Sequence, residues 1–168
     1  LGAGNGGFMC AADMAVMGYE VALYSPHANE ISGVRERGKI EVLDIDSKPT
    51  GMIGEVALAT DNLAEAISGA QIILNPIPYF LCDEYARNVG PLLEEGQLVV
   101  HLGKGGASLT WAKVLKELGI DMRVYLADVN TLPYGASKQN DFQVRLENRT
   151  QNLILATFPG KDIENAAV

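Results

Sequence analysis

Six residues near the start of the chain, Gly2-Ala3-Gly4-Asn5-Gly6-Gly7, constrain its fold more than any other segment. They fit the pattern G-x-G-x-x-G, and a run of small and apolar residues at 8–17 follows them, ended by Gly18. In a strand-to-helix turn the first glycine allows the tight turn, and the second leaves room beside the backbone. The third lets helix and strand pack closely. A helix that begins here would direct its free N–H groups at an anion.

Strand-like and helix-like runs alternate along most of the remaining chain. Short apolar runs predict strands, and longer polar and apolar mixtures between them predict helices. This alternation indicates a parallel sheet with helices on both faces. We therefore expect one α/β domain over residues 1–168, Rossmann-type and doubly wound, with a mainly parallel sheet. The expected strands are 19–24, 71–75, 97–102 and 122–127, with two further strands at 142–147 and 152–158. The expected helices are 29–37, 60–67, 79–93 and 108–118. A hairpin is expected at 39–44 and 52–59.

Composition excludes several classes of protein. The 168 residues include 13 Lys and Arg against 21 Asp and Glu, a net charge of −8 without a basic cluster, which argues against binding nucleic acid or an anionic membrane. No apolar run approaches the roughly 18 residues of a membrane-spanning helix. Cys10 and Cys82 cannot build a disulfide framework, so we expect a reducing, cytoplasmic location. His27 and His101 are the only histidines of the chain, so no metal site is expected.

The setting of the glycine motif favours binding of a dinucleotide. Ahead of a small-residue helix and further strand–helix units, the backbone of the loop would hold a pyrophosphate, and a merely structural turn is the alternative. Because the chain opens at Leu1, we expect most of the first strand to be missing. The motif lacks the G-K-[S/T] sequence of a phosphate-binding P-loop, and no G-x-S-x-G elbow indicates a nucleophilic serine. The expected cofactor-binding residues here are Gly2, Gly4, Asn5, Gly6 and Gly7.

The end of the second strand normally selects between NAD and NADP, because an acid there binds the ribose 2′-hydroxyl group of NAD. This chain has Ser25 at that point, followed by Pro26 and His27. Without an acid, a 2′-phosphate is not repelled; Ser25 could donate to it, and His27 could add partial charge. NADP is therefore slightly favoured over NAD. An exposed turn histidine is the alternative for His27.

Three more loops follow predicted strands and should lie at the carboxyl edge of the sheet, where ligands of such folds bind. Pro76, Ile77 and Pro78 would wall the nicotinamide side. Gly103 and Lys104 would offer close backbone approach and a positive charge. The loop 128–134 lies on the expected substrate side, with Asp128, Thr131 and Tyr134 as candidate residues. Ordinary turn chemistry is the alternative for each loop, a solvated side chain is the alternative for Lys104, and His101 is either a buried strand-end residue or a proton carrier.

Four segments, in the right order over nearly the whole chain, resemble the cofactor-binding domain of the octopine and opine dehydrogenase family. The opening at 2–7 is similar to the family's G-x-G-N-G-G. Residues 64–78 resemble its E-A-x-x-x-A-D stretch, with Gln71 in place of the usual Asp, and residues 96–109 match its G-Q-x-[I/V]-x…G-x-x-G segment. The sequence Thr131-Leu132-Pro133-Tyr134 looks like its T-L-P-[Y/W] loop. The family's loop usually opens with Glu and ends near Arg, where this chain has Asp128 and Ser137, which leaves the substrate open.

This resemblance implies an oxidoreductase in which an amino acid and a 2-oxo acid form an imine that accepts hydride from NADPH or NADH. The family's catalytic His–Asp pair lies in a C-terminal helical domain that this chain lacks, so no catalytic residue is assigned and this chain alone is expected to be inactive. The partners are small-molecule substrates, and a homodimer is left open. The alternatives are a dehydrogenase of the glycerol-3-phosphate or 2-dehydropantoate type and a non-catalytic NAD(P)-sensing module.

Overall fold

The computed structural model describes residues 1–103 and 105–165. It divides into two compact units: Leu1–Ala66 with Pro133–Gln151, and Ile67–Leu132 with the residues from Asn152 onward. Each unit is α/β, and each is described here by itself. Among the described residues, no helix has both the length and the apolar character to cross a membrane.

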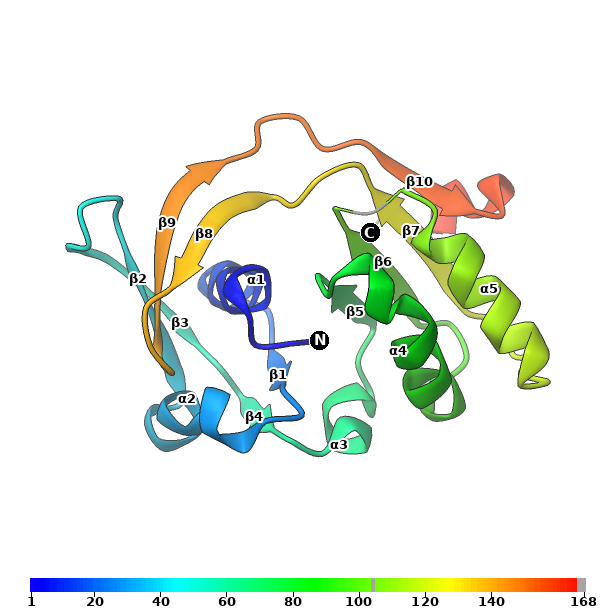
Figure 1. Ribbon diagram of the computed structural model, residues 1–168, viewed down its shortest axis with the longest axis horizontal. Helices are drawn as coiled ribbons and strands as arrows, with labels where there is room; N and C mark the ends of the chain where they lie inside the picture. The colour runs from blue at the N-terminus through cyan, green and yellow to red at the C-terminus, as the bar shows by residue number, and fades with distance from the viewer. Residues whose placement is uncertain (104, 166–168) are drawn as a thin grey trace. The chain divides into compact units, whose positions relative to one another are not determined.

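The first unit is built around helix α1 (Asn5–Val16), which packs against the sheet β3–β2–β9–β8 (Figure 1). The contact with β3 is close, because a side chain at Gly54 would meet the backbone of Ala12. The helix ends as the sequence predicts, and Gly18 has a left-handed φ of +91°. Its inward residues include Phe8 and Met9, both fully buried. The strands are β2 (Lys39–Leu43), β3 (Pro49–Glu55), β8 (Tyr134–Lys138) and β9 (Gln143–Arg149).

A separate parallel pair completes this unit. Strand β1 (Ala22–Tyr24) pairs with β4 (Leu58–Thr60), so the carboxyl ends of the two strands lie side by side. The expected hairpin is confirmed for β2 and β3, but its second strand ends at Glu55, and residues 58–60 pair with β1 instead. Short helices follow each strand of the pair: η1 (Ala28–Glu30) and α2 (Ser32–Arg37) after β1, and α3 (Leu63–Ile67) after β4.

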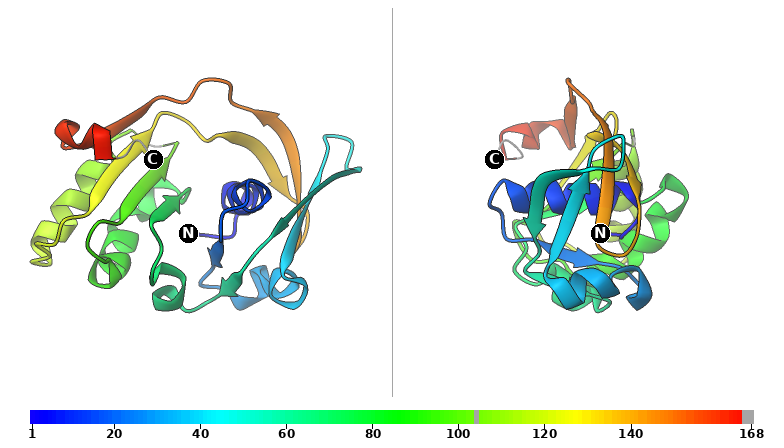
Figure 2. Two further views of the ribbon diagram at one scale, coloured as in Figure 1. Left: turned by 180° about the vertical axis from the view of Figure 1, so that it is seen from behind. Right: turned by 90° about the vertical axis from the view of Figure 1, so that its left-hand side faces the viewer.

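The second unit contains a sheet in the order β10–β7–β6–β5 (Figure 2). Strands β5 (Ile72–Asn75), β6 (Leu98–Leu102) and β7 (Tyr125–Val129) are parallel, as predicted, whereas β10 (Leu155–Phe158) adds to β7 antiparallel. Strand β6 is buried along its whole length. The helical elements of this unit are η2 (Tyr79–Leu81), α4 (Cys82–Val89), η3 (Gly90–Leu92), α5 (Ala107–Glu117) and η4 (Gly160–Asn165).

Candidate functional site

The three glycines of the G-x-G-x-x-G motif differ in their surroundings. Gly2 has a φ of +78°, a conformation that side-chain-bearing residues rarely adopt. A Cβ at Gly7 would collide with the carbonyl oxygen of Gly2, so this glycine is needed for close packing of helix on loop. Gly4, by contrast, is exposed, and a Cβ there would meet no described atom within 4 Å. The loop therefore presents an open backbone position between two sterically required glycines.

The open position at Gly4 is the N-cap of α1. No acidic side chain lies in the first turn of this helix, and no described side chain caps it. The N–H groups at the start of a helix lack intrahelical partners, and the helix dipole adds positive potential there. The residues present thus fit a pyrophosphate, because free N–H groups, positive potential and an uncrowded glycine meet at one place.

Lys138, at the end of β8, holds the glycine loop through hydrogen bonds. Its ammonium group donates hydrogen bonds to the carbonyl oxygens of Ala3 (3.0 Å) and Glu30 (2.6 Å), and it lies 4.0 Å from the centre of the Phe8 ring. Its backbone N–H also donates to the side-chain oxygen of Asn5 at 2.9 Å. Partial burial lowers the pKa of Lys138. One lysine therefore joins the glycine loop to the segment after β1, a contact that sequence spacing does not indicate.

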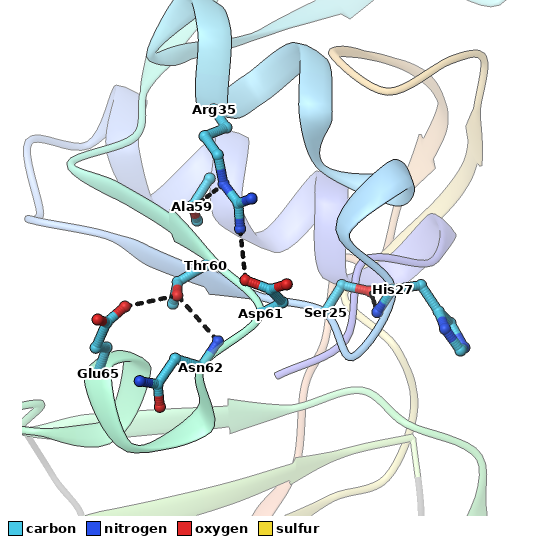
Figure 3. A network of polar contacts seen from close by, with 8 residues as sticks. All are labelled: Ser25, His27, Arg35, Ala59, Thr60, Asp61, Asn62 and Glu65. Carbon is cyan, nitrogen blue, oxygen red and sulfur yellow. Dashed lines mark hydrogen bonds and ion pairs between the residues drawn. The ribbon is translucent and has the colours of Figure 1, made fainter.

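Ser25 directly follows β1, as the sequence predicts, but its surroundings differ from the prediction. The side chain is fully buried, and its hydroxyl group donates to the Glu30 carboxylate at 2.6 Å. The same oxygen accepts a hydrogen bond from the backbone N–H of His27 at 3.2 Å. His27 itself is exposed, and Figure 3 shows its ring directed away from Ser25. The strand end therefore does hold an acid, which the sequence argument missed because it comes five residues later.

The end of β4 carries a second polar network (Figure 3). Arg35, on α2, donates to the Ala59 carbonyl oxygen at 3.0 Å and pairs with Asp61 at 2.8 Å. That hydrogen bond lowers the pKa of Asp61. Thr60 donates to Glu65 at 2.7 Å and accepts from the N–H of Asn62 at 3.0 Å. A shallow depression lies beside Arg35, lined by Ala28, Asn29, Ser32, Arg35 and Glu36.

In the second unit, the predicted loop 76–78 follows β5. Ile77 is buried, and its backbone N–H donates to the side-chain oxygen of Asn75, while Pro78 is exposed. Asn75 is itself buried and lies 2.8 Å from Nδ1 of His101 on the neighbouring strand β6. The His101 ring packs against Trp111, with 4.9 Å between ring centres. His101 is therefore an interior residue of this unit.

Gly103 follows β6 with a φ of +74°, and a Cβ there would lie 3.1 Å from the backbone nitrogen of Leu132. Lys104 lies outside the described residues. Asp128, a candidate for the substrate side, accepts hydrogen bonds from the N–H groups of Gly106 (3.2 Å) and Ser108 (3.1 Å). Its carboxylate thus caps α5.

The other two candidates for the substrate side, Thr131 and Tyr134, differ in exposure. Thr131 is half-buried, whereas Tyr134 is buried and donates its hydroxyl group to Asp13 on α1 at 2.5 Å. Arg149 forms two hydrogen bonds with the same carboxylate, of 2.6 and 2.9 Å. The Arg149 hydrogen bonds lower the pKa of Asp13, and burial raises that of Tyr134. This cluster joins α1 to β8 and β9.

Neither cysteine has the surroundings of a reactive thiol. Cys10 and Cys82 are both buried, and burial raises the pKa of Cys10 to about 12. A thiol that stays protonated at neutral pH is a poor nucleophile and a poor metal ligand. In the described part of the chain, no group of three or more His, Cys, Asp or Glu residues could hold a metal ion.

Comparison with known proteins places this geometry in a class of NAD-dependent dehydrogenase domains. The family described as "NAD-dependent glycerol-3-phosphate dehydrogenase N-terminus" matches residues 1–126. The chain belongs to this family.

Two curated relatives and one solved structure refine the assignment. An opine dehydrogenase from Arthrobacter sp. (strain 1C) is 33% identical over 122 residues, covering 71% of this chain and 33% of that protein. A glycerol-3-phosphate dehydrogenase [NAD(P)+] from Moorella thermoacetica (strain ATCC 39073 / JCM 9320) is 30% identical over 124 residues, covering 72% and 36%. A structure of octopine dehydrogenase in complex with NADH and agmatine has a TM-score of 0.78 at 20% identity and covers 93% of this chain and 40% of that one.

These matches confirm three predictions made from the sequence. The chain resembles the N-terminal cofactor domain of the opine dehydrogenase family, its fold is Rossmann-type α/β, and its relatives are oxidoreductases that use NAD or NADP. The chain spans about a third of the length of the curated relatives it matches.

Proposed function

We propose that this chain binds NAD or NADP through the glycine loop and the first turn of α1. The observation that carries the proposal is the contrast between the open position at Gly4 and the sterically closed one at Gly7. A pyrophosphate beside Gly4 would accept hydrogen bonds from the N–H groups of residues 5–7. Lys138 holds the loop by donating a hydrogen bond to the carbonyl oxygen of Ala3. When bound, the reduced nicotinamide supplies a hydride.

The intact protein, in this proposal, is an opine-dehydrogenase-like oxidoreductase acting on an imine formed from an amino acid and a 2-oxo acid. The sequence resemblance and the Arthrobacter relative support this reaction type. The chain described here contributes cofactor binding, and its role is to fix where the reduced nicotinamide is presented. Dehydrogenases of the glycerol-3-phosphate type are the second candidate, supported by the family match and the Moorella relative.

Two measurements on the intact protein test the proposal. The first is calorimetric titration with NADH and with NADPH, and absence of binding by both would overturn the cofactor assignment. The second follows loss of NADH or NADPH absorbance with pyruvate plus a panel of amino acids, with dihydroxyacetone phosphate, and with 2-dehydropantoate. Turnover that requires both the amine and the 2-oxo acid supports the opine reaction. Turnover with dihydroxyacetone phosphate or 2-dehydropantoate alone overturns it in favour of the corresponding dehydrogenase, and cofactor binding without turnover favours a sensing module.

A further inference from the structure

We propose that Glu30, positioned by Ser25, binds the ribose hydroxyl groups of the adenosine and makes this protein select NADH over NADPH. The inference rests on the proposed function, since it assigns a specificity-determining residue within that cofactor site. It reverses the slight preference for NADP that the sequence suggests. That preference depended on the absence of an acid after β1, and the structure brings one to this strand end.

The hydroxyl group of Ser25 is committed to Glu30. It donates its proton to the carboxylate at 2.6 Å and accepts the N–H of His27, and the side chain is fully buried. To donate to a 2′-phosphate instead, Ser25 would have to release its partly buried hydrogen bond to the Glu30 carboxylate. Its role is therefore to position Glu30, whose side chain is half-buried at the point where β1 ends.

The segment that carries Glu30 is adjacent to the glycine loop. The ammonium group of Lys138 donates both to the carbonyl oxygen of Ala3, inside the loop, and to that of Glu30. One nitrogen atom therefore joins the two segments. In dinucleotide-binding folds the ribose lies one phosphate group away from the glycine loop, at the end of the neighbouring strand. Glu30 thus lies beside the place where the adenosine ribose would follow the pyrophosphate.

The local hydrogen-bond pattern recurs at the end of β4, which supplies a control within the same unit. Thr60 donates to Glu65 and accepts from Asn62, with the same sequence spacing as Ser25, Glu30 and His27. The pattern by itself is thus a way to begin a helical segment after a strand. The Lys138 link to the glycine loop is what distinguishes Glu30 from Glu65.

The charges around this strand end also favour NADH. A carboxylate accepts hydrogen bonds from ribose hydroxyl groups and repels a 2′-phosphate. The nearby arginine, Arg35, is held by Asp61 and by the Ala59 carbonyl oxygen. Among the described residues, no lysine or arginine forms an ion pair within 4.0 Å of the Glu30 carboxylate, and the Lys138 ammonium group, which interacts with it at longer range, is bound to the carbonyl oxygens of Ala3 and Glu30.

The test compares dissociation constants for NADH and NADPH in the intact protein and three variants: Glu30→Gln, Glu30→Asp and Glu65→Gln. We expect the wild type to bind NADH more tightly. Glu30→Gln should lower the NADPH-to-NADH ratio of dissociation constants at least about tenfold, because the repulsion and the charged hydrogen bonds are lost together. Glu30→Asp should keep most of the discrimination, since it keeps the charge. Glu65→Gln should leave the ratio unchanged.

A purely structural role for Glu30 gives a different pattern. Glu30→Gln and Glu65→Gln would then lower the thermal midpoint of unfolding similarly and leave the ratio unchanged, which would overturn the inference. A wild type that prefers NADPH would also overturn it, and loss of that preference in Arg35→Ala would assign the 2′-phosphate to Arg35. Ser25→Ala should reduce the ratio in the same direction as Glu30→Gln. If the wild type binds neither nucleotide, the proposed function itself fails.

Discussion

Gly4 and Gly7 are three residues apart, and we expect opposite results when each is substituted. Gly4→Val should reduce NADH affinity at least about a hundredfold, or about 2.8 kcal/mol, because its side chain would fill the space of the pyrophosphate. The protein should stay folded, since no described atom lies within 4 Å of that Cβ. Replacing the N-cap glycine should cost about 1 kcal/mol at most. Isothermal titration and urea unfolding of the same samples separate the two effects.

Gly7→Ala is the matched variant. Its methyl group would collide with the Gly2 carbonyl oxygen, and such overpacking costs about 1–3 kcal/mol. The better helix propensity of Ala offsets about 1 kcal/mol of this cost, so a net loss of unfolding free energy is expected. If Gly7→Ala were as stable as the wild type while Gly4→Val unfolded, the roles assigned to the two glycines would be wrong.

At the level of single residues, the sequence predicts correctly where a backbone conformation or a close contact permits only one residue type. The steric roles of Gly2 and Gly7 follow from the motif because positive φ and close packing exclude other residues. It failed where a partner comes from elsewhere in the chain. Asp13 contacts Arg149, 136 residues away, and no spacing rule indicates such a pair. Glu30 is also not indicated, because it lies five residues beyond the strand end at which dinucleotide-binding folds normally carry the acid.

The carboxylate of Asp13 joins α1 to β8 and β9, and its contribution to stability should vary with pH. Arg149 lowers the pKa of Asp13 from its usual value of 3.8, so the folded state favours the charged form. This stabilisation is therefore complete at neutral pH and decreases as the pH falls below about 5 through the lowered native pKa. Asp13→Asn should cost about 2 kcal/mol at pH 7, because hydrogen bonds to a charged group are lost.

Urea unfolding of wild type and Asp13→Asn from pH 7 to pH 3 measures this dependence. The difference in unfolding free energy should shrink toward pH 3, because below the ordinary pKa of 3.8 the unfolded state binds a proton at Asp13 that the folded state, with its lowered pKa, resists. The exposed pair Lys48 and Asp46, at 3.6 Å, supplies a control, and Asp46→Asn should change stability by less than about 0.5 kcal/mol throughout. A difference for Asp13→Asn that does not vary with pH would contradict the assignment of charge to Asp13.

Helix α5 begins at a glycine-rich turn, and Asp128 supplies its cap from the neighbouring strand. Asp128→Ala should lower the unfolding free energy by about 1–2 kcal/mol, because the N–H groups of Gly106 and Ser108 lose their acceptor. If Asp128 only caps the helix, the Michaelis constants for the substrates should stay within about twofold of the wild-type values. A large increase in a Michaelis constant at unchanged stability would instead support the substrate-side role that the sequence suggests.

The elements that the sequence predicts well are those with a strong local pattern. The parallel strands β5, β6 and β7 are apolar runs between helices, and the structure confirms them. Strand β8, by contrast, has the sequence Tyr-Gly-Ala-Ser-Lys, which lacks apolar alternation, so the sequence predicts no strand there. Strand β8 forms because it pairs with β9 and contacts α1. The strand at β10 is predicted, but its antiparallel pairing with β7 is not, because the alternation of strands and helices does not give the direction of an added strand.

For the whole molecule, the sequence predicts that loops of both units bind the same cofactor. The predicted cofactor-binding residues are 2–7 and Ser25 in the first unit, and 76–78 and Gly103 in the second unit. Ligand binding slows amide exchange at the groups it touches, and global stabilisation slows exchange in the core as well. Peptides from the buried strand β6 therefore report the global effect, and the loop peptides report contact in excess of it.

Hydrogen–deuterium exchange of the intact protein, with and without saturating NADH, makes this comparison. We expect peptides covering residues 2–8 and 25–30 to be protected more strongly than β6, because the glycine loop and the Glu30 segment bind the adenosine diphosphate directly. Protection of peptides covering 75–82 and the loop after β6 should also exceed that of β6 if the nicotinamide lies against them. In Gly4→Val the excess protection should vanish in all of these peptides together. Protection confined to the first unit would remove residues 76–78 and Gly103 from the cofactor site while leaving the glycine loop in place.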